Sequence, residues 1–434
     1  MNRKWRETTL GEVADFFSGG TPSKNNAKYW NGTIPWISAK DMKRFVIEDT
    51  EDHLTEDGVR NGTKLVPEQT VFLLTRGMTL LNDVPISIAR RPMTFNQDVK
   101  ALRPKEGMKA EFLPYLLLGH KNRLLNLVDL AGHGTGRLNT SELKSLDILV
   151  PPEPEQLAIT NILGALDDKI ELNRRMNGTL EATARTVFKS WFVDFDPVRA
   201  KAEGRQPFGM DAATAALFPD SFDDSPLGKV PKGWRVGRVS EFTELSRDTL
   251  NPLEFPREAF DHYSIPAFDD GRWPKEETGA EIRSNKYLVP KNAVLLSKLN
   301  PRIRRVWLPT VHDDRRSIAS TEFLVALPKK DTSREYMYAL FTSQLFLEVF
   351  TTLVTGTSGS HQRVRPQFLL AMEVVIPPGA CRARFARIAT PLFDSVSRNL
   401  AEARTLAAIR DALLPKLISG EIRVKNTTDV VETM

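Results

Sequence analysis

The chain has 434 residues, 41% hydrophobic and 26% charged, which suits two to four folded globular domains and excludes a largely disordered or fibrous protein. The 60 Lys and Arg residues against 55 Asp and Glu residues give a net charge of +5, a weak indication of an anionic partner. The single cysteine argues against disulfides, and the six scattered histidines argue against a dedicated metal site. The sequence contains neither a signal-peptide core nor an apolar run of about 18 residues, which argues against a membrane span. Together these features predict a cytoplasmic protein.

The first predicted unit is a domain of mixed helix and sheet over residues 1–152. Val71–Leu74 and Asp147–Val150 are apolar runs of strand length, whereas Phe112–Leu127 is long enough to form a helix. The last run meets Pro151-Pro152, which marks the end of the domain.

A long helix is predicted next, over residues 153–196. Eight of ten positions spaced alternately four and three residues apart are apolar, which is the repeat of a coiled-coil seam. A helix from Ile159 to Trp191 would be about 50 Å long and could not bury such a stripe alone. The residues chosen as the predicted seam, one of them polar, are Ile159, Leu163, Leu166, Ile170, Asn173, Leu180, Val187 and Trp191.

Residues 197–229 are predicted to be a mostly irregular linker with one short alanine-rich turn, because glycine and proline recur along them. A second mixed domain is predicted over residues 230–378, because it repeats the first at offsets of 223 to 229 positions. Within it, Tyr336–Val349 is the helix-length apolar segment. The repeated segments are Trp5-Arg6 with Trp234-Arg235, Leu65-Val66-Pro67 with Leu288-Val289-Pro290, and Ile148–Pro152 with Val374–Pro378.

A second long helix is predicted over residues 379–425, followed by a tail over residues 426–434. Its seam residues are Phe385, Leu392, Val396, Asn399, Leu406, Leu413 and Leu417. If the two helices pair, chain connectivity makes them antiparallel, with Asn173 and Asn399 as polar seam residues that can fix the register. The predicted fold class is therefore α+β, with two pseudo-repeated mixed α/β domains separated by an antiparallel two-helix coiled coil. The alternative is that each helix lies on its own domain.

Known catalytic signatures are missing from the sequence. No phosphate-binding G-x-x-x-x-G-K-[ST] loop occurs, no dinucleotide fingerprint follows a predicted strand, and no nucleophile and base stand at a recognisable spacing. The paired carboxylates Asp167-Asp168 are expected on a solvated helix face. The sequence therefore predicts no site for ATP, a dinucleotide, S-adenosylmethionine or a metal in this chain.

Two polar, glycine-rich segments stand at the same place in both domains, Gly132–Asn139 and Thr355–Arg363. Such loops bring backbone N–H groups to phosphate and Arg, His, Gln or Asn to base edges, although each could be an ordinary surface turn. Trp30, Trp36, Trp273 and Trp307 are expected in the core rather than stacked on bases. The predicted DNA-binding residues are Ser18, Thr21, Lys24, Lys40, Arg76, Arg91, Asn96, His133, Thr135 and Arg137 in the first domain, and Lys298, Arg302, Arg304, Thr321, Thr357, Ser358, His361, Gln362 and Arg363 in the second.

The whole layout resembles the specificity subunit of type I restriction-modification enzymes, and the likeness covers nearly the full chain. One departure is Cys381-Arg382, which stands where the first repeat has Glu155-Gln156 and leaves the start of the second helix in doubt. The segments that carry the resemblance are Trp5–Pro22, Ile34–Ile37, Pro151–Gln156, Lys189–Lys201 and Leu413–Ile422.

The resemblance implies two target-recognition domains, each of which reads one half of a bipartite asymmetric DNA site, in a chain that is non-catalytic by itself and binds no cofactor. It further implies that the central helices dock two modification subunits, which use S-adenosylmethionine to methylate adenine, and that restriction subunits use ATP and Mg. Arg363→Ala is then expected to weaken binding to one half-site. Two other readings stay open: a coiled-coil scaffold with two protein-binding domains and no DNA contact, and a self-sufficient DNA enzyme.

Overall fold

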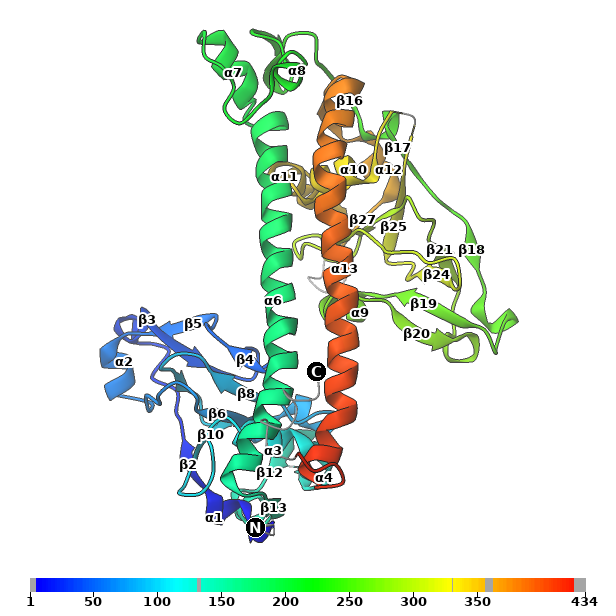
Figure 1. Ribbon diagram of the computed structural model, residues 1–434. Coiled ribbons are helices and arrows are strands. Elements are labelled where there is room, and N and C mark those ends of the chain that lie inside the picture. The colour runs from blue at the N-terminus through cyan, green and yellow to red at the C-terminus, as the bar shows by residue number, and fades with distance from the viewer. Residues whose placement is uncertain (1–4, 131–133, 330, 356–361, 425–434) are drawn as a thin grey trace, which may run out of the picture. The chain divides into compact units, whose positions relative to one another are not determined.

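The computed structural model describes residues 5–130, 134–329, 331–355 and 362–424, which form two compact units (Figure 1). Unit 1 comprises Met1–Glu171 and Arg404–Met434, and unit 2 comprises Leu172–Ala403. Each unit therefore contains one of the two predicted domains together with a section of both long helices.

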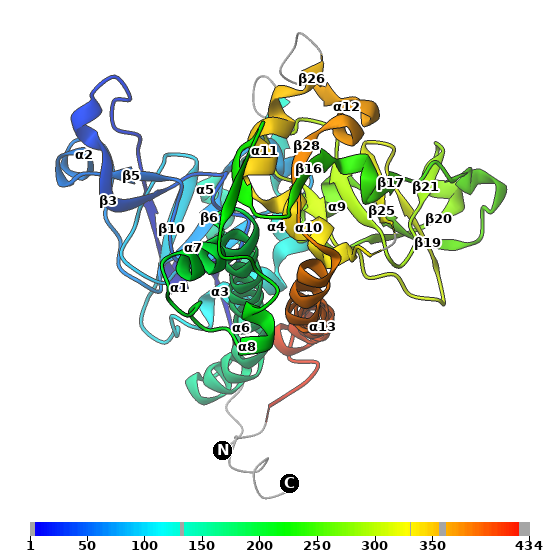
Figure 2. The ribbon, with the colours of Figure 1, turned by 90° about the horizontal axis from the view of Figure 1, so that it is seen from above.

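Unit 1 is built on a five-stranded sheet of order β2-β10-β6-β8-β4, flanked by the ribbon β1-β13 and the sheets β5-β3-β9 and β11-β12-β7. In Figure 2, β3, β5 and helix α2 lie at the edge of the unit, away from the long helix α6. The elements are β1 (Arg6–Thr9), α1 (Leu10–Val13), β2 (Ala14–Ser18), β3 (Trp30–Ile37), β4 (Val46–Ile47), β5 (Asp52–Leu54), α2 (Glu56–Arg60), β6 (Val71–Leu74), β7 (Arg76–Gly77), β8 (Ile86–Ala89), β9 (Thr94–Phe95), β10 (Val99–Pro104), α3 (Leu113–Gly119), α4 (Lys121–Asn126), β11 (Val128–Leu130), β12 (Gly136–Leu138), α5 (Thr140–Lys144), β13 (Asp147–Val150) and α6 (Glu153–Phe192).

Unit 2 repeats four consecutive strands of this sheet, β2-β10-β6-β8, as β17-β25-β22-β23 and the ribbon β1-β13 as β16-β28, with the same antiparallel pairings. It differs in a five-stranded sheet, β18-β21-β24-β19-β20. The elements are α7 (Asp196–Ala202), α8 (Ala212–Ala215), β14 (Phe222–Ser225), β15 (Gly228–Pro231), β16 (Arg235–Arg238), β17 (Thr243–Leu245), β18 (Thr249–Leu250), β19 (Ala259–Tyr263), α9 (Ile265–Asp269), β20 (Lys275–Thr278), β21 (Lys286–Leu288), β22 (Val294–Ser297), β23 (Val306–Trp307), β24 (Arg316–Ala319), β25 (Phe323–Pro328), α10 (Arg334–Thr342), α11 (Gln344–Thr352), β26 (Val354–Thr355), β27 (Arg363–Val364), α12 (Pro366–Ala371), β28 (Glu373–Ile376) and α13 (Gly379–Ile418).

The helix predicted over Phe112–Leu127 is two short helices, α3 and α4, with a break at His120. Glycine is a poor helix former, and Gly119 is needed there because a Cβ on it would come within 2.8 Å of the Ile418 side chain. The prediction of one helix over Tyr336–Val349 is wrong in the same way. Ser343 separates α10 from α11, and its hydroxyl caps α11.

The helices α6 and α13 have 40 residues each and pair antiparallel. In unit 1, Arg410 of α13 donates to Asp167 of α6, and in unit 2, Asn399 donates to Asn177, so the partner number falls as the α6 number rises. All fifteen predicted seam residues are buried or half-buried. Asn173 donates to Glu402 at 2.8 Å, so the two predicted seam asparagines do not pair with each other. The predicted fold class, two mixed domains with an antiparallel helix pair, is confirmed.

The predicted boundaries of the long helices and the linker are wrong in detail. The first helix ends at Phe192 rather than at residue 196, because Phe195 adopts a left-handed conformation with φ 56°. The second ends at Ile418 rather than at residue 425, close to Gly420, which has φ 76°. Its start at Gly379 agrees with the predicted bound although Glu155-Gln156 has no counterpart there.

The segment over residues 197–229 is folded rather than mostly irregular. It contains most of α7, all of α8 and most of the hairpin β14-β15, and it packs into the core of unit 2. The Phe218 side chain is 1% exposed and its ring lies 5.2 Å from that of Trp191. Glycine and proline mark turns here, but the buried aromatic side chains between them fix the segment.

No described helix is long and apolar enough to cross a membrane. In the same ranges, no group of three or more His, Cys, Asp or Glu side chains could hold a metal ion.

Candidate nucleic-acid interface

In unit 1, the β11-β12 hairpin carries the first glycine-rich segment and pairs with β7. Arg137 of β12 stands opposite Asp129 of β11 and opposite Arg76 of β7. Both arginine side chains are exposed. Gly136 packs the hairpin onto the domain, since a Cβ there would lie 2.7 Å from Leu80 Cβ. The fold therefore presents two arginines side by side on a fixed platform.

In unit 2, the β26-β27 hairpin has the same register as β11-β12. Val354 pairs with Val364 and Thr355 with Arg363, each 226 positions beyond its counterpart in unit 1. Leu299 bridges to Arg363 as Arg76 does to Arg137. The repeat predicted from the sequence thus places the two loops equivalently.

The two equivalent arginines differ in their partners. Arg137 has no carboxylate partner among the residues that the structure describes, whereas Arg363 makes a bidentate ion pair with Glu322 at 2.9 and 3.0 Å. The hydrogen bond to Arg363 holds the pKa of Glu322 below its ordinary value. Arg363 is predicted to contact DNA directly, but in the free protein its guanidinium is paired with Glu322.

Other predicted residues of unit 2 gather beside β27. The Lys298 carbonyl accepts from Val364 N, and the Gln362 carbonyl accepts from Asn300 N at 2.9 Å. Arg302 is exposed and has no side-chain partner within the described ranges, while Arg304 donates to Gln344 at 3.0 Å. Thr321 is exposed one residue before Glu322. The loop after β22 and the β26-β27 hairpin therefore form one surface.

The remaining predicted residues of unit 1 do not form one cluster. Ser18 accepts from Lys100, and Thr21 donates to Gln97 at 2.6 Å. Lys24 lies 6.0 Å from the Trp30 ring, and Arg91 is exposed near the Thr33 carbonyl. Thr135 is half-buried beside the β11-β12 loop.

Two of the predicted residues of unit 1, Lys40 and Asn96, already have partners within the protein. Lys40 lies 2.9 Å from Asp52 and 3.1 Å from Glu51, and the hydrogen bond to Asp52 raises its pKa, so its charge is already balanced. Asn96 is 7% exposed and its Oδ1 accepts from Asp98 N, so it shapes a turn. His133, Thr357, Ser358 and His361 lie outside the described residues.

Sequence patterns missed two exposed apolar side chains at this surface. Leu130 in β11 is 75% exposed, and Met78, directly after β7, is 60% exposed. Apolar side chains beside arginines suit contact with thymine methyl groups or base edges. Leu and Met are ordinary core residues, so no signal in the sequence distinguishes these two.

The expectation that Asp167-Asp168 lies on a solvated face is wrong for Asp167. Its side chain is 10% exposed and accepts hydrogen bonds from Tyr115 and Arg410. Asp168 is exposed and meets Arg90 at 3.3 Å. The two neighbours point to different sides of α6, which the adjacency of their letters could not show.

The Glu155-Gln156 pair has a structural explanation. Gln156 is fully buried and makes three hydrogen bonds of 2.9 Å, to Lys109 N and to the carbonyls of Gly107 and Pro151. Glu155 accepts from Trp5 Nε1 at 2.9 Å and from Arg423. Glu155 therefore joins Trp5 and Arg423 to the start of α6, and Gln156 joins the segment around Lys109 to it.

The counterpart in unit 2 lacks this arrangement. Cys381 stands at the position of Glu155 and donates weakly to the Leu217 carbonyl. Trp234, the counterpart of Trp5, has a buried indole N–H without an acceptor among the described residues. The linker instead covers this place in unit 2.

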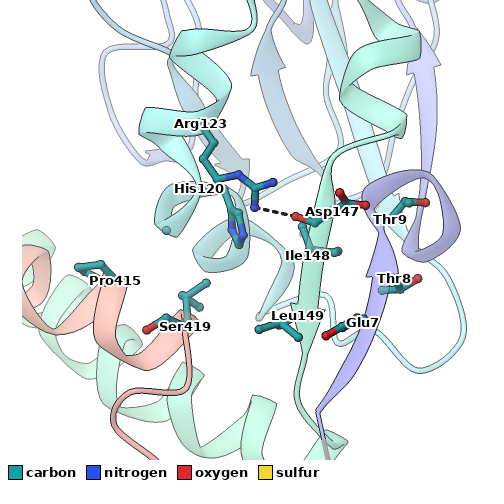
Figure 3. Close-up of a pocket in the computed structure, with 12 residues that line it drawn as sticks. Glu7, Thr8, Thr9, His120, Arg123, Asp147, Ile148, Leu149, Pro415 and Ser419 are labelled. Atoms are coloured by element: carbon teal, nitrogen blue, oxygen red, sulfur yellow. Dashed lines mark hydrogen bonds between the residues drawn. The ribbon is translucent and has the colours of Figure 1, made fainter.

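A separate groove of about 810 Å³ lies in unit 1 between the β1-β13 ribbon, the α3-α4 turn and the end of α13 (Figure 3). Arg123 donates to the Asp147 carbonyl there at 2.7 Å. His120 Nδ1 donates to the Leu116 carbonyl at 2.8 Å, and burial lowers the pKa of this imidazole. None of the predicted DNA-binding residues lines the groove.

We expect acidification from pH 7.5 to 5.5 to destabilise unit 1 through His120. The His120 pKa is lower in the folded protein than in the unfolded chain. The stability that His120 contributes is therefore complete above the ordinary pKa of about 6.5 and is lost as the pH falls through the lowered pKa. The free energy of unfolding falls by no more than about 1.4 kcal/mol per pH unit in this range. Hydrogen exchange of unit 1 peptides at several pH values measures this loss of stability. His120→Gln should flatten the dependence of unit 1 stability on pH, whereas His312→Gln, at an exposed site in unit 2, should leave it unchanged. Equal pH profiles for the wild type and His120→Gln would contradict the role of His120.

Comparison with known proteins agrees with this architecture. Residues 2–182 match the family described as the type I restriction modification DNA specificity domain. The chain is 26% identical to the type I restriction enzyme MjaIX specificity subunit of Methanocaldococcus jannaschii, with 98% of this chain and 94% of that protein covered. It is 35% identical to the EcoR124I/EcoR124II specificity subunit of Escherichia coli, over 38% of this chain and 41% of that protein.

A solved structure shares the fold. The crystal structure of the type I restriction-modification system S subunit from M. genitalium covers 96% of both chains with a TM-score of 0.54 at 14% identity. Together with two repeated mixed domains and a pair of antiparallel 40-residue helices, these matches show that residues 2–182 are similar to the type I restriction modification DNA specificity domain and that the chain as a whole resembles type I restriction enzyme specificity subunits.

Proposed function

We propose that this chain selects the DNA site of a type I restriction-modification complex, with each repeated domain binding one half of a bipartite, asymmetric site. The observation that carries the proposal is the pair of hairpins β11-β12 and β26-β27, which share one register and hold Arg137 and Arg363 at equivalent positions, each next to a glycine-rich stretch of the sequence. Backbone N–H groups and arginines of such loops hold phosphates, and their side chains read base edges.

The two half-sites are expected to differ. Arg137 stands opposite Arg76, whereas its counterpart Arg363 stands opposite Leu299 and is paired with Glu322. Different side chains at equivalent positions present different donors and acceptors to the bases. Joining two readers in one chain also raises the effective concentration of the second at its half-site.

The helix pair is proposed to set the gap between the half-sites and to dock two modification subunits and the restriction subunits. Exposed apolar side chains on α6 support a docking role, because Leu172 is 50% and Met176 42% exposed on a helix that already buries its seam. In this proposal the partners supply S-adenosylmethionine, ATP and Mg, and this chain contributes recognition without catalysis.

Methylation mapping of a host that carries the chain with its modification subunits tests the proposal. The expected result is one split motif that contains adenine, with two unlike halves and a fixed gap. A continuous or palindromic motif would contradict the two-reader arrangement.

Duplex binding by the full chain at several salt concentrations tests the DNA contact itself. Phosphate neutralisation gives a steep loss of affinity as salt rises. A flat salt dependence would favour the scaffold, and methyl transfer by the isolated chain would reveal an enzyme.

A further inference from the structure

A buried polar cluster in unit 1 joins three helices. Asp167 of α6 accepts a hydrogen bond from the Tyr115 hydroxyl of α3 at 2.8 Å and another from Arg410 Nη1 of α13 at 2.6 Å. The side chains of Asp167 and Arg410 are 10% and 21% exposed. Each member therefore comes from a different element, and the carboxylate is the point at which they meet.

Every charge in the cluster has a fixed partner. Arg410 also donates to Asp411 at 2.7 and 2.9 Å, so its guanidinium is held between two carboxylates. The Tyr115 ring packs 5.3 Å from the Phe45 ring, and burial together with the charge of Asp167 raises the pKa of its hydroxyl, which stays protonated as a donor. Removing one partner would leave a buried charge uncompensated, so the geometry tolerates little displacement.

The apolar seam alone does not define one register. A slip of seven residues sets apolar seam positions against apolar positions again, and it moves one helix by about 10 Å, the length of about three base pairs. Such a slip would separate Asp167 from Arg410 and leave the Asp167 carboxylate buried without its cationic partner. The cluster therefore adds a specific penalty against these alternatives, beside the hydrogen bonds of Asn399 with Asn177 and of Asn173 with Glu402.

Tyr115 extends this constraint to the domain. It belongs to α3, whose residues Leu113, Leu116 and Leu117 lie in the core of unit 1, so its hydroxyl ties that core to the same carboxylate that fixes α13. One side chain, Asp167, thus contributes both to the position of the domain along α6 and to the position of α13 along α6.

We propose that Asp167, Arg410 and Tyr115 are positioning residues that set which gap between half-sites the complex accepts. This inference rests on the proposed function, since it needs a bipartite site. The residues touch no DNA in this scheme and act through the helix register.

The test uses the complete complex and a panel of duplexes with identical half-sites and gaps that differ by one base pair. We expect the wild type to prefer one gap over its neighbours by about tenfold, and Asp167→Ala and Tyr115→Phe to reduce this ratio several-fold. Arg410→Lys, which keeps the positive charge, should retain more of the preference than Arg410→Leu. The matched control is Asp168→Ala, an exposed neighbour that should leave the profile unchanged.

The outcomes separate this inference from the proposed function. A wild type without a split site contradicts the proposed function itself. A wild type with a split site whose gap preference survives in Asp167→Ala and Tyr115→Phe, even with lower stability, overturns the positioning role alone. If Asp167→Ala fails to fold, Tyr115→Phe decides, because it removes one oxygen atom and keeps the packed ring.

Discussion

Phe385→Ala is expected to destabilise unit 2 by about 3–5 kcal/mol, the usual cost of truncating a fully buried phenylalanine. Phe385 lies in the first turns of α13 and is fully buried, with ring centroids 5.5 Å from Phe188 and 5.6 Å from Phe192 of α6. The substitution would open a cavity where the start of α13 meets the end of α6. Because the chain has two units, the opening free energy is best measured by hydrogen exchange of peptides from β22 and β25 rather than from one unfolding curve.

Phe208→Ala is the matched control for this experiment. Phe208 is the same residue type in the same unit, but it is fully exposed on the segment between α7 and α8. Its truncation should change stability by no more than about 0.5 kcal/mol. Equal effects of the two substitutions would show that the aromatic cluster does not hold the helices together.

The double variant Arg76→Ala with Arg137→Ala is expected to weaken binding to one half-site by about 1–3 kcal/mol for each arginine that reads a base. If both contact phosphates instead, the slope of log affinity against log salt should fall by about two. These side chains are exposed, paired in register, and free of carboxylate partners among the described residues, so their positive charge is available to DNA. Binding to duplexes that carry one altered half-site at a time identifies which half is affected.

Lys40→Ala is the control for the double variant. Asp52 and Glu51 already balance the Lys40 charge, so its removal should leave the salt slope unchanged. Arg363→Ala is a less direct test than the sequence suggests, because it also leaves Glu322 without its partner. The DNA-contact role of Arg76 and Arg137 would be contradicted if their double variant and Lys40→Ala gave the same slope.

The contrast between Arg137 and Arg363 shows the limit of the sequence at the candidate site. The repeat predicts that the two residues occupy equivalent positions, and the shared strand register bears this out. Their availability depends on residues far along the chain, since Glu322 is 41 positions before Arg363. Long-range ion pairs leave no local pattern, so the sequence could place these arginines but could not tell which one is free.

Periodicity and repetition were sufficient to predict the architecture. The heptad seam and the duplicated double-proline boundary determine two mixed domains and two long helices, because a continuous apolar stripe must be buried along its whole length. What only the tertiary structure decided is the set of polar contacts: Asp167 enclosed by Tyr115 and Arg410, Lys40 neutralised, and the linker packed around Phe218. Burial of apolar residues follows a regular spacing, whereas a hydrogen bond needs two particular atoms within about 3 Å, and that coincidence depends on how distant segments meet.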